Sequence, residues 1–118
     1  MIYHITGTSN WAEAQASGLY SAPSLETEGF IHCSSIDQIL PVANSMFRSE
    51  RNLLVLCIDE SKLGAQVLWE APIHPNPSAT DDVLFPHVYG PVEVAAVKWV
   101  ADLAEGDSGF ALPAELQN

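Results

Sequence analysis

Three of the four histidines in this chain lie inside short apolar or turn-forming strings. His4 lies in residues 2–6, His32 in residues 29–35 and His87 in residues 85–91. An imidazole among hydrophobic side chains is held at the edge of a core or cleft, where it can bind a polar ligand or transfer a proton near neutral pH. We therefore expect the three strings to converge on one concave ligand site.

The string around His32 predicts a strand that turns directly into a helix. Gly29 allows close approach to the backbone, and Ser34 and Ser35 follow His32 at the expected helix start. Such a corner offers backbone N–H donors to an anion or a carboxamide. The alternative is that the two serines only cap the helix and that His32 is a hydrogen-bonded core histidine.

The strings around His4 and His87 carry further polar groups on extended backbone. His4 could donate a hydrogen bond to a ribose hydroxyl or a carbonyl, unless it is a core histidine. Pro86 and Pro91 stiffen their segment, and His87 and Tyr89 share a face if that segment is extended. The alternative for this string is a rigid turn that covers a sheet edge.

Glu70 ends a predicted strand and could act as a general base or accept hydrogen bonds from ribose hydroxyls, unless it is a solvated strand end. A zinc site would need His32, Cys33, His74 and His87, all of which the chain contains. No CxxC or HxxxH spacing supports it, so we predict no metal. Cys33 is not predicted to be a nucleophile activated by His32, because adjacent strand residues point to opposite faces.

Length and charge limit the classes of function. A chain of 118 residues forms one domain, and it has no apolar run near the roughly 20 residues that cross a bilayer. Without a secretory signal we expect a cytoplasmic protein with no membrane contact. Its formal charge of −11 repels nucleic acid, so we expect no nucleic-acid partner. A small phosphorylated ligand could still bind to backbone N–H groups and one or two arginines. Cys33 and Cys57 are expected to be reduced and buried.

The elements that must position these residues alternate between strands and helices, which predicts an α+β domain. The expected strands are residues 1–6, 30–33, 53–58, 67–70 and 94–100. Ser9 or Asn10 is expected to cap a helix over 11–17, and Ser35 with Gln38 forms a capping box for a helix that reaches Phe47. Pro41 favours a start of that helix nearer Leu40. Residues 71–84 form a long loop.

Taken together, the strings resemble the bacterial family called domain of unknown function 952. The resemblance rests on Gly29-Phe30-Ile31-His32-Cys33-Ser34, on Trp69-Glu70 and on Phe85-Pro86-His87-Val88-Tyr89-Gly90-Pro91, and it covers about residues 2–100. It implies a fold like the ADP-ribosyltransferases, with two small, roughly perpendicular sheets, flanking helices and a central cleft that holds NAD in active relatives. The domain would span residues 1–101, followed by an acidic, partly mobile tail over 102–118 with Phe110 and Leu112 as docking points.

The resemblance also implies roles for single residues. His4, with Thr6 beside it in the strand, corresponds to the polar position that contacts the ribose end of NAD, and the segment from His32 through Ser34 to Ser35 corresponds to a second ligand-binding motif. Glu70, or the pair of His87 and Tyr89, stands in place of the glutamate that stabilises the oxocarbenium-like ribose. The implied function is an NAD-dependent ADP-ribosyl transferase or glycohydrolase that needs no metal. The alternative is a catalytically inactive ligand-binding or protein-interaction module, because a fold does not determine function.

Overall fold

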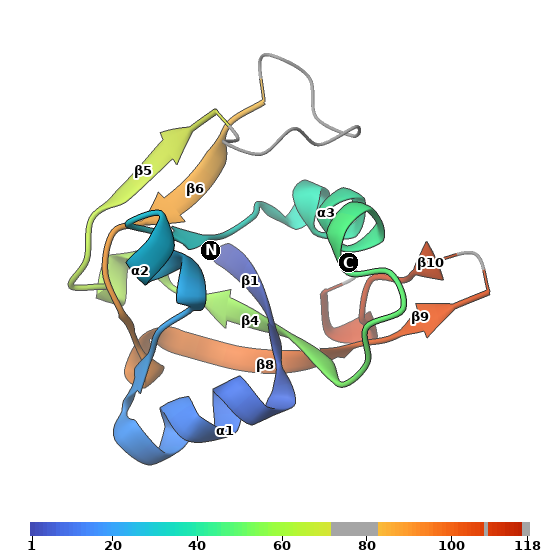
Figure 1. The fold of residues 1–118 in the computed structure, drawn as a ribbon, viewed down its shortest axis with the longest axis horizontal. Helices are drawn as coiled ribbons and strands as arrows, with labels where there is room; N and C mark the ends of the chain where they lie inside the picture. The colour runs from blue at the N-terminus through green and yellow to red at the C-terminus, as the bar shows by residue number, and fades with distance from the viewer. Residues whose placement is uncertain (72–82, 108, 117–118) are drawn as a thin grey trace.

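The computed structural model describes residues 1–71, 83–107 and 109–116, and Figure 1 shows their arrangement. The strands are β1 Ile2–Gly7, β2 Leu19–Tyr20, β3 Ile31–His32, β4 Leu53–Ile58, β5 Val67–Glu70, β6 Phe85–Val88, β7 Val92–Glu93, β8 Val97–Leu103, β9 Glu105–Gly106 and β10 Gly109–Phe110. The α-helices are α1 Thr8–Ser17, α2 Pro23–Thr27 and α3 Ile39–Met46. Short 3-10 helices span Ile36–Gln38, Glu60–Lys62, Val94–Ala96 and Ala114–Leu116. In these described ranges, no helix is both long and apolar enough to span a bilayer.

The first sheet has the antiparallel order β1-β4-β8, with β4 in the centre. Every residue of β4 is buried, which confirms the prediction that 53–58 is a central strand covered on both faces. Since side chains alternate along a strand, successive residues of β4 enter two different cores.

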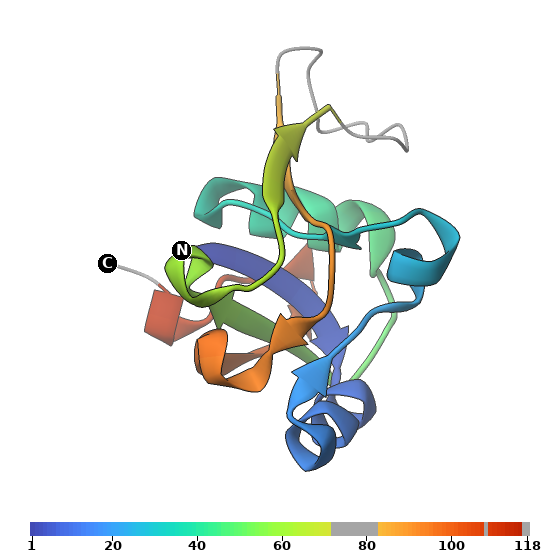
Figure 2. The same cartoon turned by 90° about the vertical axis from the view of Figure 1, so that its left-hand side faces the viewer.

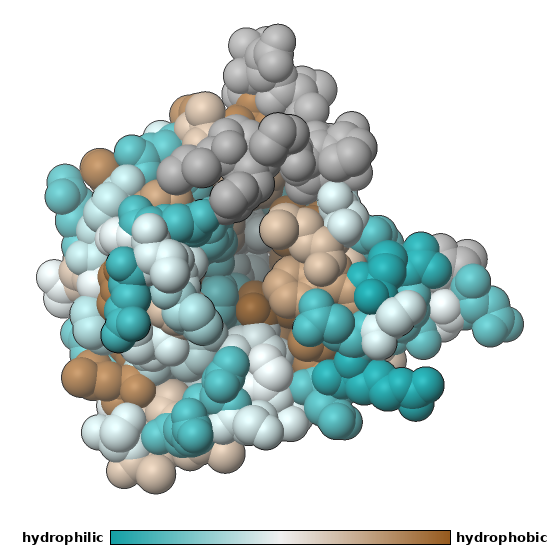
Figure 3. All heavy atoms as spheres, in the orientation of Figure 1, coloured by the Kyte–Doolittle hydropathy of each residue, from teal (hydrophilic) through white to brown (hydrophobic). Residues whose placement is uncertain are grey.

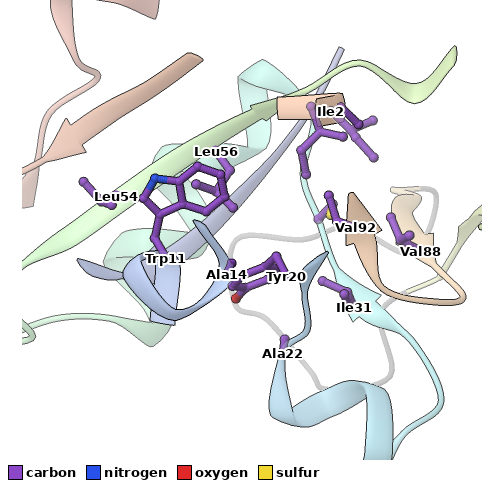
Figure 4. Packing of buried hydrophobic residues seen from close by; sticks show 13 residues of the cluster. Ile2, Trp11, Ala14, Tyr20, Ala22, Ile31, Leu54, Leu56, Val88 and Val92 are labelled. Atoms are coloured by element: carbon purple, nitrogen blue, oxygen red, sulfur yellow. The ribbon is translucent and has the colours of Figure 1, made fainter. Parts of the chain in front are cut away.

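The core on one face of this sheet, here called core 1, holds α1, β2 and the second sheet against β4. Leu54, Leu56 and Ile58 belong to it. Figure 4 shows Trp11 of α1 beside Leu54 and Leu56, and Tyr20 of β2 beside Ala14. Core 2, on the other face, contains Val55 and Cys57 and is covered by α3 and the C-terminal segment. Both cysteines are free and buried, as predicted.

The second sheet has the antiparallel order β3-β6-β5 and carries most of the predicted site. It rises beside α2 in Figure 2 and joins the first sheet through a single bridge between Tyr3 and Ser34. Pro86 lies in the central strand of this sheet, although proline cannot donate a hydrogen bond to a neighbouring strand. Pro86 still accepts a hydrogen bond from the N–H of Cys33 over 3.0 Å, just past the end of β3 at His32, so the strand keeps its acceptor there and lacks only the donor. The segment 85–88 is therefore a strand and not a turn at a sheet edge.

The helices follow the predicted signals with two corrections. Gly7, and neither Ser9 nor Asn10, precedes α1, which starts at Thr8 because the strand runs directly into it. The capping box of Ser35 and Gln38 is present, but it opens a 3-10 turn before α3. Pro41 lies in the first turn of α3, where its missing N–H would have no partner inside the helix.

Two further differences concern segments without strong local patterns. The short elements β2 and α2, between residues 19 and 27, were not predicted. Residues 94–96 form a 3-10 turn, so the last long strand begins at Val97 and continues to Leu103, beyond the expected end of the domain. Phe110 and Leu116 are buried in core 2, and Leu112 packs against it. The partial mobility of this tail stays a prediction.

Candidate functional site

One face of the second sheet gathers five residues, Phe30, His32, Glu70, His87 and Tyr89, which we call the polar face. His32 and Leu68 both lie opposite His87 in the strand register, and Glu70 and Tyr89 lie two residues from that row. Residues two apart on a strand point to the same side, so these side chains meet. The intervening residues, such as Ile31 and Val88, turn into core 1.

Glu70 is held at the centre of the polar face by two donors. The Nδ1–H of His87 donates to Glu70 Oε1 over 2.8 Å, and the Tyr89 hydroxyl donates to the same oxygen over 2.5 Å. The hydrogen bond from Tyr89, followed by that from His87, lowers the pKa of Glu70, whereas the same carboxylate raises the pKa of Tyr89. Glu70 is therefore a carboxylate at neutral pH.

The two oxygens of Glu70 differ in their hydrogen bonding. Oε2 accepts no hydrogen bond from the residues that the structure describes, and the Glu70 side chain is 37% exposed. His87, in contrast, is buried beneath it with a side chain only 2% exposed. The arrangement presents one fixed carboxylate oxygen to the outside.

Phe30 forms the floor of the polar face and brings the two histidines together. Its ring is stacked on that of His87 at 4.0 Å between centroids, and it contacts His32 edge-on at 4.8 Å and Tyr89 at 5.4 Å. The rings of His32 and His87 are 5.6 Å apart. The imidazole of His32, the Glu70 carboxylate and the Tyr89 phenol thus lie close together above the buried ring of His87.

Glu28 is a member of the site that the sequence did not single out. It immediately follows α2 and pairs with Nε2 of His32, four residues later. The chain turns back between them at Gly29, whose φ of +90° is unfavourable for other residues, and whose N–H donates to Ser24 O over 3.1 Å. The sequence signal that could have identified Glu28 is its position directly before the Gly-Phe-Ile-His string.

His4 and Thr6 lie in a buried hydrogen-bonded network behind the polar face. His4 Nδ1 donates to the backbone oxygen of His32 over 2.5 Å, because a carbonyl oxygen can only accept. His4 Nε2 lies 2.7 Å from the hydroxyl of Tyr20, which in turn lies 2.9 Å from Thr6 Oγ1. Both ring nitrogens of His4 are therefore engaged within the protein.

Burial determines the protonation state of His4 and Tyr20, and so which group donates each hydrogen bond in this network. It lowers the pKa of His4 to about 4, so the imidazole is neutral at pH 7 and its Nε2 accepts the single Tyr20 hydroxyl proton. The Thr6 hydroxyl must then donate to Tyr20. Burial also raises the pKa of Tyr20 and so keeps it protonated. This network positions the backbone of His32, and Tyr20 was missed because no motif surrounds it.

The serines after His32 do not provide the expected open N–H groups. Ser34 N donates to Tyr3 O over 2.7 Å, and Ser35 N donates to Gln38 Oε1 over 2.9 Å within the capping box. These two donors are already used by the strand bridge and the helix cap. The helix-capping alternative describes Ser35, and ligand binding by Ser34 and Ser35 stays a prediction.

Cys33 belongs to the opposite face of the strand, as predicted. It is buried in core 1, and this burial raises the pKa of its thiol, which makes it a poor nucleophile. Within the described ranges, no three His, Cys, Asp or Glu side chains are grouped to hold a metal ion. His74, the remaining candidate zinc ligand, lies outside those ranges.

The surface is hollowed beside these elements. Figure 3 shows a depression between the side of α2 and β6 and the side of α3. A separate concave region is lined by residues 49–53 and 102–107 and contains none of the predicted site residues. The structure thus brings His32, Glu70, His87 and Tyr89 together on one face, with His4 and Thr6 supporting it from within.

This chain is similar to one protein family and to solved structures of one bacterial protein. The sequence profile of DUF952, described as a protein of unknown function, matches residues 5–100. An X-ray structure of protein CC0527 from Caulobacter crescentus is 32% identical, with a TM-score of 0.82 over 98% of this chain and 96% of that chain. A solution NMR structure of CC0527 is also 32% identical, with a TM-score of 0.73 over 92% and 89% of the two chains. No curated protein matches this chain.

Proposed function

The chain belongs to the DUF952 family, and from this premise we propose that the polar face binds a ligand of the NAD type and cleaves the bond between nicotinamide and ribose. The observation that supports this most is Glu70, whose one oxygen is held by His87 and Tyr89 while the other is open. A fixed carboxylate stabilises the positive charge that develops on the ribose as nicotinamide leaves. The likeness to ADP-ribosyltransferases in fold is part of this proposal.

Besides NAD and a water molecule or an acceptor hydroxyl, the proposed reaction uses only Glu70, His32 and Glu28. The bond between ribose C1′ and the nicotinamide nitrogen breaks, and its electron pair neutralises the pyridinium nitrogen. Glu70 Oε2 faces the resulting oxocarbenium-like carbon. A water molecule, or the hydroxyl of an acceptor, then forms the new bond to C1′, and its proton passes to His32, which Glu28 orients.

The buried network has a supporting role in this proposal. His4 holds the backbone oxygen of His32, and Thr6 completes the chain of hydroxyls through Tyr20. Ser34 and Ser35 hold the same strand through their backbone atoms. None of these groups needs to touch the reacting atoms.

The test is nicotinamide release, measured by chromatography with the purified chain and NAD. We expect release by the unmodified protein and a fall in kcat of about tenfold or more in Glu70→Gln, which keeps the shape but removes the charge. Glu50→Gln is the matched control, because Glu50 is exposed and lies before β4, away from the polar face. An unchanged kcat in Glu70→Gln would remove Glu70 from the mechanism. Binding of NAD without release would favour the inactive binding module.

A further inference from the structure

We propose that the polar face recognises the cationic, phosphate-free part of such a ligand, so that its substrate class is pyridinium N-ribosides and not dinucleotides as such. This inference rests on the proposed function, since it concerns the same site. The polar face carries negative and aromatic groups and no lysine or arginine.

The polar face contains anionic and aromatic groups. Glu70 is a carboxylate with one open oxygen, and Glu28 lies beside His32 with its side chain 20% exposed. The ring of Tyr89 is partly exposed, with 39% of the residue accessible. A carboxylate and the face of an aromatic ring are the two groups that attract a flat organic cation.

No lysine or arginine lies within a strand of the polar face. The chain has four such residues, and none occurs in residues 1–47 or 63–97, which include β3, β5 and β6. Arg48 pairs with Glu105, and Lys98 lies 4.0 Å from Asp59. Arg51 lines the separate concave region, and Lys62 lies in the 3-10 turn after β4. None of these contacts involves a residue of the polar face.

The corner after β3 does not supply an anion site in their place. The N–H groups of Ser34 and Ser35, at the corner that could have bound an anion, are already hydrogen-bonded within the protein. The turn that follows carries Asp37, whose negative charge opposes an anion there. With a net charge of −11 on the chain, a pyrophosphate is repelled at long range and unpartnered at short range.

These observations separate the two halves of NAD. The nicotinamide ring is a pyridinium cation on a ribose, which suits the Glu70 carboxylate and the Tyr89 ring. The pyrophosphate finds no cationic partner. Nicotinamide riboside should therefore bind as well as NAD or better, and ADP-ribose, which lacks the cation and keeps both phosphates, should bind weakly.

Calorimetric titration of the full, unmodified chain tests this without any variant. The probes are nicotinamide riboside, its reduced form, NAD and ADP-ribose. The reduced riboside has almost the same shape but no charge, so it isolates the contribution of the cation. We expect the oxidised riboside to bind about tenfold more tightly than the reduced form, and ADP-ribose to bind at least about tenfold more weakly than the oxidised riboside.

Equal binding of the two ribosides, or ADP-ribose binding as tightly as NAD, would overturn the inference. Absence of heat from the oxidised riboside at millimolar concentration would overturn it as well. Nicotinamide release is measured separately on the same samples. The expected binding order without release would support the inference while refuting the proposed cleavage. Release from NAD together with tight binding of ADP-ribose would do the reverse.

Discussion

At the scale of single residues, the site depends on which polar atoms are already bonded within the protein. Both nitrogens of His4 are engaged, whereas Glu70 uses one oxygen and leaves the other open. The buried neutral imidazole of His4 supports the backbone of His32, and the partly exposed Glu70 carboxylate is the group to which we assign the proposed chemistry. Two titrations follow from this difference.

The buried His4 should make the stability of the protein depend on pH between about 4 and 6.5. Its pKa falls from 6.5 to about 4 on folding, so in this range the unfolded chain binds a proton that the folded protein does not. The stabilisation is complete above pH 6.5 and is lost as the pH falls towards 4, by about 3 kcal/mol in total. Urea unfolding at a series of pH values measures it. The variant His4→Gln should show a shallower slope over this range, and identical slopes would contradict the assignment.

The hydroxyl of Tyr89 should control the ionisation of Glu70. The hydrogen bond from Tyr89 is the largest cause of the lowered pKa of Glu70, so Tyr89→Phe should raise that pKa towards its ordinary value. Carbon-detected NMR titration of the carboxyl group measures the change. Tyr3→Phe is the control, because Tyr3 packs against core 2 on the other side of the first sheet. A pKa of Glu70 that is the same in Tyr89→Phe would mean that His87 alone holds it.

At the scale of elements, the site depends on the turn that leads from α2 to β3. Gly29 adopts a φ of +90° between Glu28 and Phe30, so the turn directs both flanking side chains towards His32. The helix, the turn and the strand form one short unit. The string that carries His32 therefore positions the site only in the presence of this glycine.

The substitution Gly29→Ala should destabilise the protein through its backbone and not through a clash. A Cβ at this position would meet no atom within 4 Å, but the left-handed conformation costs a residue with a side chain about 1–2 kcal/mol. Thermal or urea unfolding measures the loss. Gly106→Ala is the matched control, since its Cβ would make an ordinary contact at 3.7 Å and its φ is not positive, so we expect a change below roughly 0.5 kcal/mol. Equal effects of the two substitutions would argue against strain at Gly29.

At the scale of the whole molecule, the central sheet separates two cores, and only core 1 lies under the polar face. Core 2 is closed by the C-terminal segment, where Phe110 is 6% exposed and its N–H donates to Asn44 Oδ1 of α3 over 2.8 Å. This segment thus contributes to stability, at a distance in the fold from the proposed chemistry.

Truncation of Phe110 should therefore weaken the fold. Phe110→Ala removes a buried aromatic ring and leaves a cavity, which costs about 3–5 kcal/mol. Equilibrium unfolding in urea measures this loss, and Met46→Ala is the control, because Met46 is 57% exposed. A cost below roughly 1 kcal/mol for Phe110→Ala would mean that the segment is only loosely attached.

Several elements of the fold could be predicted from local sequence patterns, because interactions between residues close in the sequence determine those elements. The continuous apolar run of 53–58 can only be stable as a strand buried on both faces, and the spacing of Ser35 and Gln38 satisfies helix-end donors from within the same turn. The two motif strings also identified His32, His87 and Tyr89 as neighbours of Glu70. The short elements β2 and α2 escaped prediction, since two or five residues carry too little periodicity.

The sequence by itself determined the α+β class, the strongly negative charge and the polar residues from which a site could be built. Only the tertiary structure decided which of them meet. The register that sets His32 opposite His87, the contact of His4 with Tyr20 and the bridge from Tyr3 to Ser34 all join residues that are 16 or more positions apart. Such contacts depend on how the chain crosses itself, and no local propensity specifies them. In the folded chain the N–H groups of Ser34 and Ser35 are hydrogen-bonded to Tyr3 and Gln38. One oxygen of Glu70 has no hydrogen-bond donor among the described residues.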